Sequence, residues 1–246
     1  MSTGFERVEI LLCDADGNLF PSEEPAFDAS TEVTNRVLAE LGIDRSFTPD
    51  ELRGVAVGKN FRATITDLAA EHGITLDPDV LEREVLEEKR AVSAHLAEVL
   101  GPDPAVLEPL TELAQRYRLA AVSSSALTRL DACFEATGLA GLFPASDRYS
   151  AEDSLPAPTS KPDPAIYQLA GARLGVEGDR AVAIEDAVAG VRSAVAAGFP
   201  CVGNVLFVGP DERDERIAAL TDAGAVAVVG SWWELSELLT GAAATA

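Results

Sequence analysis

From Leu119 onward, short apolar runs alternate with stretches of helical periodicity, and this alternation constrains the fold more than any other feature of the chain. Short, continuously apolar runs are typical of strands buried on both faces, and the periodic stretches between them are typical of amphipathic helices. Repeats of strand and helix form a parallel sheet covered by helices. An earlier apolar run, Val8–Cys13, predicts a further strand. We therefore expect an α/β protein with a Rossmann-like parallel sheet. The later strands are predicted at 119–122, 181–184, 201–205 and 225–229, and the helices near 126–137, 164–174, 187–197, 211–223 and 231–240.

Residues from about 20 to 100 break this pattern, because they contain several amphipathic helical stretches and no convincing strand. Connections between a strand and the next element are usually short. Some eighty residues of helix after the first strand therefore predict an inserted α-helical cap domain, covering 21–100, in a core domain made of 1–20 and 101–246. Proline-rich stretches at 21–25 and 101–104 are the expected hinges. Helices are predicted in the insertion at 31–41, 61–72 and 79–100.

The charge balance of the 246-residue chain, 19 Lys and Arg against 41 Asp and Glu, gives a net charge of −22. Nucleic-acid and anionic-membrane binding need a basic surface, so we expect neither partner. No signal peptide or membrane span is recognisable, which predicts a soluble cytoplasmic protein, a monomer or weak homodimer. Two histidines, His72 and His95, are too few for the usual zinc site or Ser-His-Asp triad. The cysteines, expected to be reduced and buried, are Cys13, Cys133 and Cys201.

Polar residues follow the predicted strands at the ends where ligands bind in parallel α/β sheets. Each group has an ordinary structural explanation by itself, as a turn, a helix cap or a solvated surface lysine. Together the groups complement one another chemically, because they combine carboxylates, hydroxyls and one cation at a single edge of the sheet. They are Asp14 and Asp16 after the first strand, Ser123 to Ser125 after the second, Glu185 and Asp186 after the third, and Lys161 in the loop before the third.

Four segments, in this order, resemble the motifs of the haloacid dehalogenase-like hydrolase superfamily. The resemblance spans almost the whole chain, and the helical insertion resembles that superfamily's first cap type. The pattern is most similar to small-metabolite phosphatases and to the β-phosphoglucomutase-like group. The segments are Asp14-Ala15-Asp16-Gly17-Asn18-Leu19, Val122-Ser123-Ser124-Ser125, Ser160-Lys161-Pro162-Asp163-Pro164 and Ile184-Glu185-Asp186-Ala187-Val188-Ala189-Gly190.

The resemblance and the chemistry of phosphoryl transfer agree on the two aspartates. Transfer needs an in-line nucleophile and a group that protonates the leaving oxygen. Asp14 is expected to attack phosphorus and form an aspartyl-phosphate, as carboxylates do in some ATPases. Asp16 is expected to be the general acid for the leaving alcohol and then the general base for water.

The other site residues are expected to hold the phosphate and its metal. Two unit charges 4 Å apart repel by about 4 kcal/mol at an effective dielectric of 20, so a bare carboxylate facing a phosphate needs a counter-ion. Mg²⁺ suits oxygen ligands, and Asp14, Asp186 and the backbone carbonyl of Asp16 are predicted to hold it, with Glu185 as a further ligand. Lys161 is predicted to contact a phosphate oxygen or the nucleophile. The hydroxyl groups of the predicted phosphate site are those of Ser123 and Ser124.

Substrate choice is expected to come from the cap, because the core motifs contact only the phosphate. The segment 53–62 contains two glycines and several cations, and in it Lys59 and Asn60 are the predicted substrate contacts. Charged residues at helix starts are usually solvated surface residues. If Lys59 contacts substrate, Lys59→Ala should raise KM more than it lowers kcat.

The leading interpretation is a magnesium-dependent phosphatase for a small phosphorylated metabolite, with sugar phosphates as candidates. A sugar phosphomutase is the alternative with the same fold, and a phospho-Asp switch or a binding protein is the non-enzymatic one. A dehalogenase is disfavoured, because Asp16 and Asp186 suit a metal-dependent acid–base mechanism. The chain departs from the family pattern at Asn18, where Thr or Val is usual, and at Pro21, where Asp is frequent. It also lacks the cap-entry His of the mutases.

Overall fold

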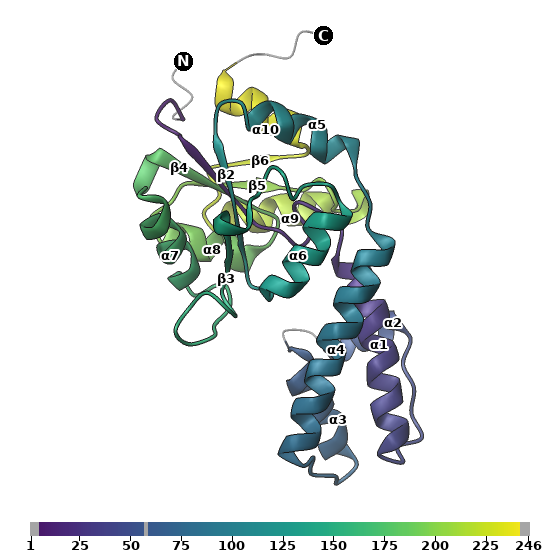
Figure 1. Ribbon diagram of the computed structural model, residues 1–246. Helices are drawn as coiled ribbons and strands as arrows, with labels where there is room; N and C mark the ends of the chain where they lie inside the picture. Colours follow the sequence, from purple (N-terminus) through teal and green to yellow (C-terminus); the bar gives the residue numbers. More distant parts are fainter. Residues whose placement is uncertain (1–4, 57–58, 242–246) are drawn as a thin grey trace. The chain divides into compact units, whose positions relative to one another are not determined.

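The computed structural model describes residues 5–56 and 59–241, and its centre is a six-stranded sheet in which every neighbouring pair of strands is parallel (Figure 1). The spatial order of the strands is β3-β2-β1-β4-β5-β6. This confirms the predicted α/β class. The strands are β1 Ile10–Cys13, β2 Arg118–Ser123, β3 Arg148–Ser150, β4 Ala181–Glu185, β5 Cys201–Asn204 and β6 Ala227–Val229.

Both faces of the sheet are covered, which explains why its strands read as continuous apolar runs. Successive side chains of a strand point to opposite faces. In β1, Ile10 and Leu12 join a core cluster with residues of α7, α8 and α9, while Leu11 and Cys13, fully buried as well, face the other side. The helices of this part of the chain are α5 Pro104–Leu113, α6 Leu127–Ala136, α7 Ala165–Leu174, α8 Val188–Ala196, α9 Pro210–Asp222 and α10 Trp232–Thr240.

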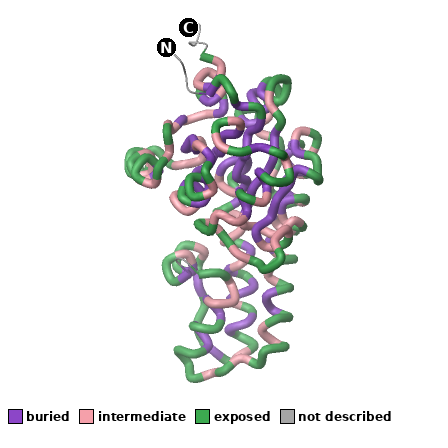
Figure 2. Tube along the Cα trace, turned by 90° about the vertical axis from the view of Figure 1, so that its left-hand side faces the viewer, coloured by how far each residue is buried: buried purple, intermediate pink, exposed green. Residues whose placement is uncertain are grey.

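The chain divides into two compact units, one made of the described residues up to Pro21 and from Gly101 onward, the other of Ser22–Leu100. The second unit, here called the helical unit, has its own core, in which Val37 and Leu38 of the first helix pack with Ile65 and Leu68 of the third. The trace in Figure 2 shows buried positions within each unit. The helices of the helical unit are α1 Glu23–Glu40, α2 Pro49–Val55, α3 Phe61–Glu71 and α4 Pro78–Val99.

Several elements differ from the sequence-based expectation. Helix α1 begins at Glu23, well before the predicted 31, because Pro25 lies in its first turn, where a missing N–H costs no helical hydrogen bond. Helices α2 and α5 and strand β3 were not predicted, and β6 is shorter than expected. In β3 the sequence Arg148–Ser150 is short and polar at both ends, so it has no apolar run to identify it.

A small cavity lies in the first unit where the chain leaves it and returns. Pro21, the last residue before the helical unit, and Gly101, the first after it, both line this cavity. Side chains of α5, among them Val106, close its wall. The two connecting points of the insertion therefore lie next to each other.

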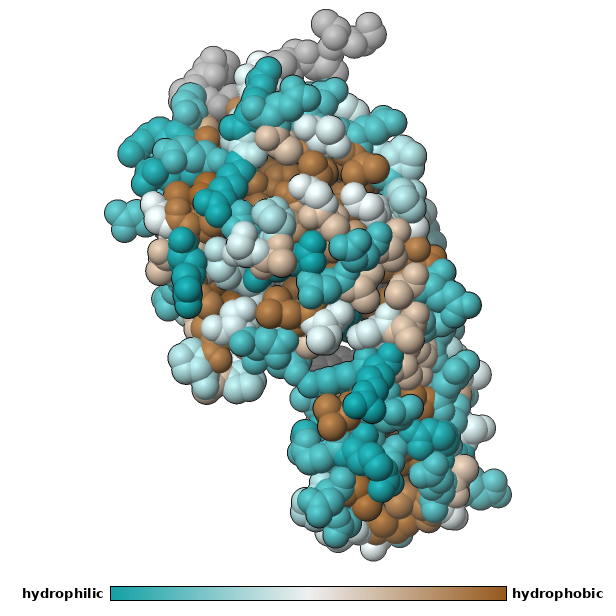
Figure 3. Space-filling model, viewed as in Figure 1, coloured by the Kyte–Doolittle hydropathy of each residue, from teal (hydrophilic) through white to brown (hydrophobic). Residues whose placement is uncertain are grey.

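On the face shown in Figure 3, hydrophilic side chains are interspersed with groups of apolar ones. In the described part of the chain, no helix combines the length and the apolar composition that crossing a bilayer requires.

Candidate active site

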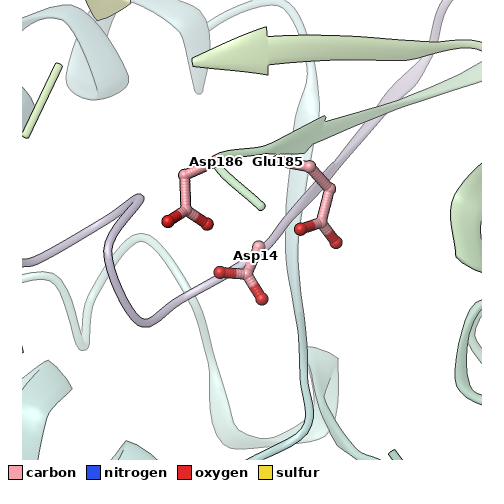
Figure 4. Close-up of side chains that lie close together, drawn as sticks. All are labelled: Asp14, Glu185 and Asp186. Atoms are coloured by element: carbon pink, nitrogen blue, oxygen red, sulfur yellow. The ribbon is translucent and has the colours of Figure 1, made fainter. Parts of the chain in front are cut away.

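Three carboxylates meet at the carboxyl ends of β1 and β4 (Figure 4). Asp14 follows β1, Glu185 ends β4 and Asp186 comes next. Because β1 pairs with β4, the Asp14 amide donates to the carbonyl of Ile184 at 2.9 Å, which brings the two chain segments together. All three residues are buried, and one ligand oxygen of each lies within 4.8 Å of the others.

Lys161 brings a positive charge into this cluster. Its Nζ donates to Asp14 Oδ1, to Glu185 Oε1 at 2.7 Å and to the carbonyl of Val122 at 2.7 Å. The side chain is only 6% exposed, so this is a buried ion pair and not a surface contact. The Lys161 amide also donates to Ser124 Oγ at 3.1 Å, which fixes its loop to the end of β2.

The ionisation of these groups reflects burial opposed by mutual attraction. Burial raises the pKa of Asp14 well above its usual range; Lys161 opposes this shift, and Glu185 and Asp186 add to it. Burial likewise raises the pKa of Glu185, against the effect of Lys161 and of a Tyr167 hydroxyl. For Lys161, burial acts to lower the pKa, but the two carboxylates raise it above its ordinary value. The lysine therefore stays charged, and the carboxylates favour an additional cation.

The donor set fits a divalent cation. Asp14 and Glu185 both pair with the one charge of Lys161, and Asp186 adds a third buried carboxylate beside them. Carboxylate oxygens that converge in this way suit Mg²⁺. Two glycines leave room for the carboxylates of Asp186 and Glu185. A Cβ on Gly17 would lie 2.4 Å from Asp186 Oδ2, and a Cβ on Gly190 would lie 1.7 Å from Glu185 Oε2. Gly17 also has a φ of +76°, which other residues rarely adopt.

Asp16 does not join the three carboxylates and has partners of its own. Its Oδ1 accepts a hydrogen bond from Arg129 Nη2 and its Oδ2 accepts one from Ser125 Oγ, both at 2.7 Å. The side chain is 19% exposed, so it is the more accessible of the two aspartates after β1. A carboxylate with this exposure can exchange protons with solvent or with a bound molecule.

Of the two serines predicted to hold phosphate, Ser123 is the last residue of β2 and Ser124 is the first residue after it. Ser123 is buried and its Oγ accepts from the Ser125 amide at 3.0 Å. Ser124 Oγ accepts from the Lys161 amide, as described above. Their contact with phosphate stays a prediction.

Lys59 and Asn60, the predicted substrate contacts, belong to the helical unit, where each has a local partner. Lys59 Nζ forms an ion pair with Asp67 at 2.7 Å. The side chain of Asn60 caps α3 by accepting from the Ala63 amide at 3.0 Å. Both residues are exposed. Their role toward substrate stays a prediction.

Sequence reasoning missed the residues that hold the site in place. Asn18, which departs from the family pattern, is fully buried and donates to the carbonyls of Asp14 at 2.9 Å and Ile184 at 3.2 Å. Asn204 at the end of β5 donates to Asn18 Oδ1 at 2.9 Å. Asn18 and Asn204 therefore join the turn after β1 to the carboxyl ends of β4 and β5.

Tyr167 and Arg129 were missed as well, and Ser125 was grouped with the site without a role of its own. Tyr167 donates its hydroxyl hydrogen to Glu185 Oε1 from inside the core, and burial raises the pKa of this phenol well above its usual value. In sequence it reads as an ordinary apolar position of a helix. Ser125 and Arg129 are the partners of Asp16, and the fold brings Arg129, which belongs to none of the four motifs, to the site.

A family model described as haloacid dehalogenase-like hydrolase matches residues 8–198. The chain is 30% identical over 227 residues to the "Phosphorylated carbohydrates phosphatase" of Thermotoga maritima, a match that covers 90% of this chain and 94% of that protein. It is 31% identical over 203 residues to the chloroplastic protein SUPPRESSOR OF QUENCHING 1 of Arabidopsis thaliana, covering 80% of this chain but only 18% of that much longer relative.

Among solved structures, the chain resembles CbbY from Rhodobacter sphaeroides in complex with xylulose-(1,5)bisphosphate. The TM-score is 0.70 at 26% sequence identity, and the match covers 93% of this chain and 96% of that one.

Proposed function

The chain belongs to the haloacid dehalogenase-like hydrolase family, and on that basis we propose that it is a magnesium-dependent phosphatase of small phosphorylated sugars that works through an aspartyl-phosphate. The observation that carries the proposal is the buried ion pair between Asp14 and Lys161, which lies beside the carboxylates of Glu185 and Asp186. The names of two relatives, a phosphatase of phosphorylated carbohydrates and a protein solved with a sugar bisphosphate, support the substrate class.

In the first half-reaction, Asp14 is the nucleophile. A bond forms between one of its carboxylate oxygens and phosphorus, and the bond between phosphorus and the ester oxygen breaks. Asp16 gives its proton to that ester oxygen, which leaves as an alcohol. The position of Asp16, apart from the buried carboxylates and more exposed than Asp14, supports this division of roles.

In the second half-reaction, the deprotonated Asp16 takes a proton from water as the water oxygen attacks phosphorus. The bond between Asp14 and phosphorus breaks, and inorganic phosphate and the free Asp14 carboxylate are the products. Lys161 holds Asp14 in line throughout, because the hydrogen bonds of its ammonium group to Glu185 and to a carbonyl fix its position.

Mg²⁺ would be held by Asp14, Asp186 and the backbone carbonyl of Asp16, with Glu185 as a further ligand, and when bound it neutralises phosphate charge that these carboxylates would repel. Ser123 and Ser124 are the proposed hydroxyl contacts of the phosphate. We expect the protein to act in the cytoplasm, as a monomer or weak homodimer.

The test is phosphate release from a panel of phosphorylated sugars, polyols and nucleotides, with Mg²⁺ and with EDTA. Asp14→Asn is nearly isosteric and removes the nucleophile, so we expect turnover to fall by at least about 10³-fold. Asp147→Asn, which changes a buried aspartate of the first unit that binds Arg118, controls for general effects of an Asp-to-Asn change.

Each result has a distinct meaning. Release that needs Mg²⁺ and is lost only in Asp14→Asn supports the phosphatase. Conversion of one sugar phosphate into its isomer without net release of phosphate would instead identify a mutase. Stable phosphorylation of Asp14 by a small phosphodonor, without turnover, would identify a switch.

A further inference from the structure

Asp16 is held by two donors that come from one short segment, the end of the loop after β2 and the first turns of α6. Ser125 Oγ lies 2.7 Å from Oδ2, and Arg129 Nη2 lies 2.7 Å from Oδ1. Each carboxylate oxygen thus has its own donor, which fixes the rotation of the carboxylate plane as well as its position. A single donor would leave that rotation free.

The pair differs from the surface ion pairs of the protein in its burial. The side chains of Arg129 and Asp16 are 24% and 19% exposed, and Arg129 Nε is buried without a hydrogen-bond partner. An arginine kept in such a place loses hydration that a surface arginine retains.

We propose that Arg129, assisted by Ser125, is the positioning residue that holds the Asp16 carboxylate where it exchanges protons with the leaving oxygen and with water. The inference rests on the proposed phosphatase function. It assigns a role to a residue outside the four motifs, through its contact with Asp16. Proton transfer requires heavy atoms within hydrogen-bond reach, and a misplacement of about 1 Å can cost about 10²-fold in rate.

The test compares Arg129→Gln and Arg129→Lys with the wild type. Arg129→Gln removes the ion pair, and we expect kcat to fall by about 10- to 100-fold while KM changes by less than about threefold, because Arg129 contacts Asp16 and not the substrate. Arg129→Lys keeps the charge without the planar fork and should recover part of the loss. Ser125→Ala removes the second donor and should give a smaller decrease of the same kind.

The control is Arg118→Gln. Arg118 binds Asp147 with two hydrogen bonds of 2.7 and 2.6 Å at the start of β2, away from the carboxyl ends of the strands. The Arg118→Gln change removes another arginine–aspartate pair of the same unit without touching Asp16. We expect kcat and KM to stay at wild-type values.

A leaving-group comparison separates positioning from a structural effect. An alkyl phosphate needs a proton on its leaving oxygen, whereas p-nitrophenyl phosphate releases a stable phenolate without one. In Arg129→Gln, kcat/KM should therefore fall at least about tenfold more for glycerol phosphate than for p-nitrophenyl phosphate. Equal losses on both substrates would overturn the inference.

A double-mutant cycle with Asp16→Asn supplies a readout that does not need turnover. If Arg129 acts through Asp16, the shifts of the urea midpoint for the two single variants will not add up in the double variant. Additive shifts would overturn the inference about Arg129. A wild-type protein that releases no phosphate from any substrate would overturn the proposed function instead, so the two failures are distinguishable.

Discussion

Lys161 joins Asp14 to Glu185, because its ammonium group donates a hydrogen bond to a carboxylate oxygen of each. The third donor goes to the carbonyl of Val122 in β2. All three hydrogens of the ammonium group are therefore used within the protein. The lysine connects β2, β1 and β4 at the edge where the site lies, so it contributes to stability as well as to charge.

Replacing Lys161 by Met should destabilise the protein and abolish activity. The change leaves two buried carboxylates without their cation, which costs about 3 kcal/mol of unfolding free energy. We expect kcat to fall by at least about 10²-fold. Urea unfolding measures the first effect and phosphate release the second. The double variant Lys161→Met, Glu185→Gln should regain part of the stability, because it removes one stranded carboxylate; no recovery would contradict the explanation.

Replacing Tyr167 by Phe should weaken the metal site without unfolding the core. The hydroxyl donates to Glu185, and hydrogen bonds to charged groups contribute about 1.5 kcal/mol or more. We expect about a tenfold weaker apparent affinity for Mg²⁺, measured by titration calorimetry, since partners of metal ligands typically contribute 10- to 100-fold. Because burial raises the pKa of Tyr167 well above its usual value, the phenol keeps its proton, and the effect should be the same between about pH 6 and 9. Tyr149→Phe, which lies on β3 outside the site, is the control.

Replacing Gly190 by Ala should displace Glu185. The new Cβ would lie 1.7 Å from Glu185 Oε2, so the carboxylate has to move. We expect a loss of about 1–3 kcal/mol in unfolding free energy and weaker Mg²⁺ binding. Gly54→Ala is the matched control, because Gly54 is also helical but exposed, with nothing within 4 Å of a new Cβ. It should stabilise the protein by about 0.5 kcal/mol.

The cysteines should be unreactive in the folded protein. Cys13, Cys133 and Cys201 are all buried with free thiols. Burial raises the pKa of Cys133 to about 12 and raises those of Cys13 and Cys201 well above their usual values. Thiolate, the reactive form, is therefore scarce at neutral pH. Ellman's reagent should label all three in guanidinium chloride and almost none of them in buffer; rapid labelling of the native protein would contradict this burial.

Acid should weaken the helical unit through Glu84. This residue of α4 is buried and accepts from Arg36 at 2.8 Å and Arg83 at 2.9 Å. Burial acts to raise its pKa, but the two arginines lower it below the ordinary value. A depressed pKa in the folded state means that the stabilisation is complete above the unfolded pKa, about 4.3, and is lost as the pH falls through the folded pKa.

Glu84→Gln should therefore lower the unfolding free energy at neutral pH by about 1–2 kcal/mol, a value reduced because Arg36 is partly exposed. It should also flatten the dependence of stability on pH below about 5. Urea unfolding of both proteins between about pH 3 and 7 measures this. Glu71→Gln, which breaks an exposed pair with Arg45, should leave the profile close to that of the wild type.

The sheet and the segments of the site could be predicted from the sequence, because both depend on local patterns. Apolar runs mark strands that are buried on both faces, and the residues after them lie at one edge of any parallel sheet. Asp14, Glu185 and Asp186 could be grouped on that ground, whereas Lys161, in the loop before α7, was added because its charge complements theirs and because its segment resembles a family motif. Strand β3 could not be predicted in this way, because Arg148–Ser150 contains no apolar run. It belongs to the sheet because it pairs with β2.

The contacts between side chains could not be predicted, because they depend on how helices are rotated against the sheet. Arg129 and Asp16 are 113 positions apart, and nothing in the local sequence of α6 distinguishes this arginine from a solvated one. Tyr167 reaches Glu185 only because α7 packs on the sheet with that face inward. Sequence therefore indicates which groups are available, and packing decides which of them pair.

The neighbouring positions of Pro21 and Gly101 on one cavity have a consequence for how such a chain can evolve. The ends of the insertion are already held together by the first unit. The free-energy cost of closing a flexible loop rises only slowly with its length, by about 0.6 kcal/mol for each doubling. Segments of different length and sequence can therefore be exchanged between these two points at little thermodynamic cost. A lineage can therefore replace this one contiguous stretch while the carboxylate cluster of the other unit is inherited unchanged.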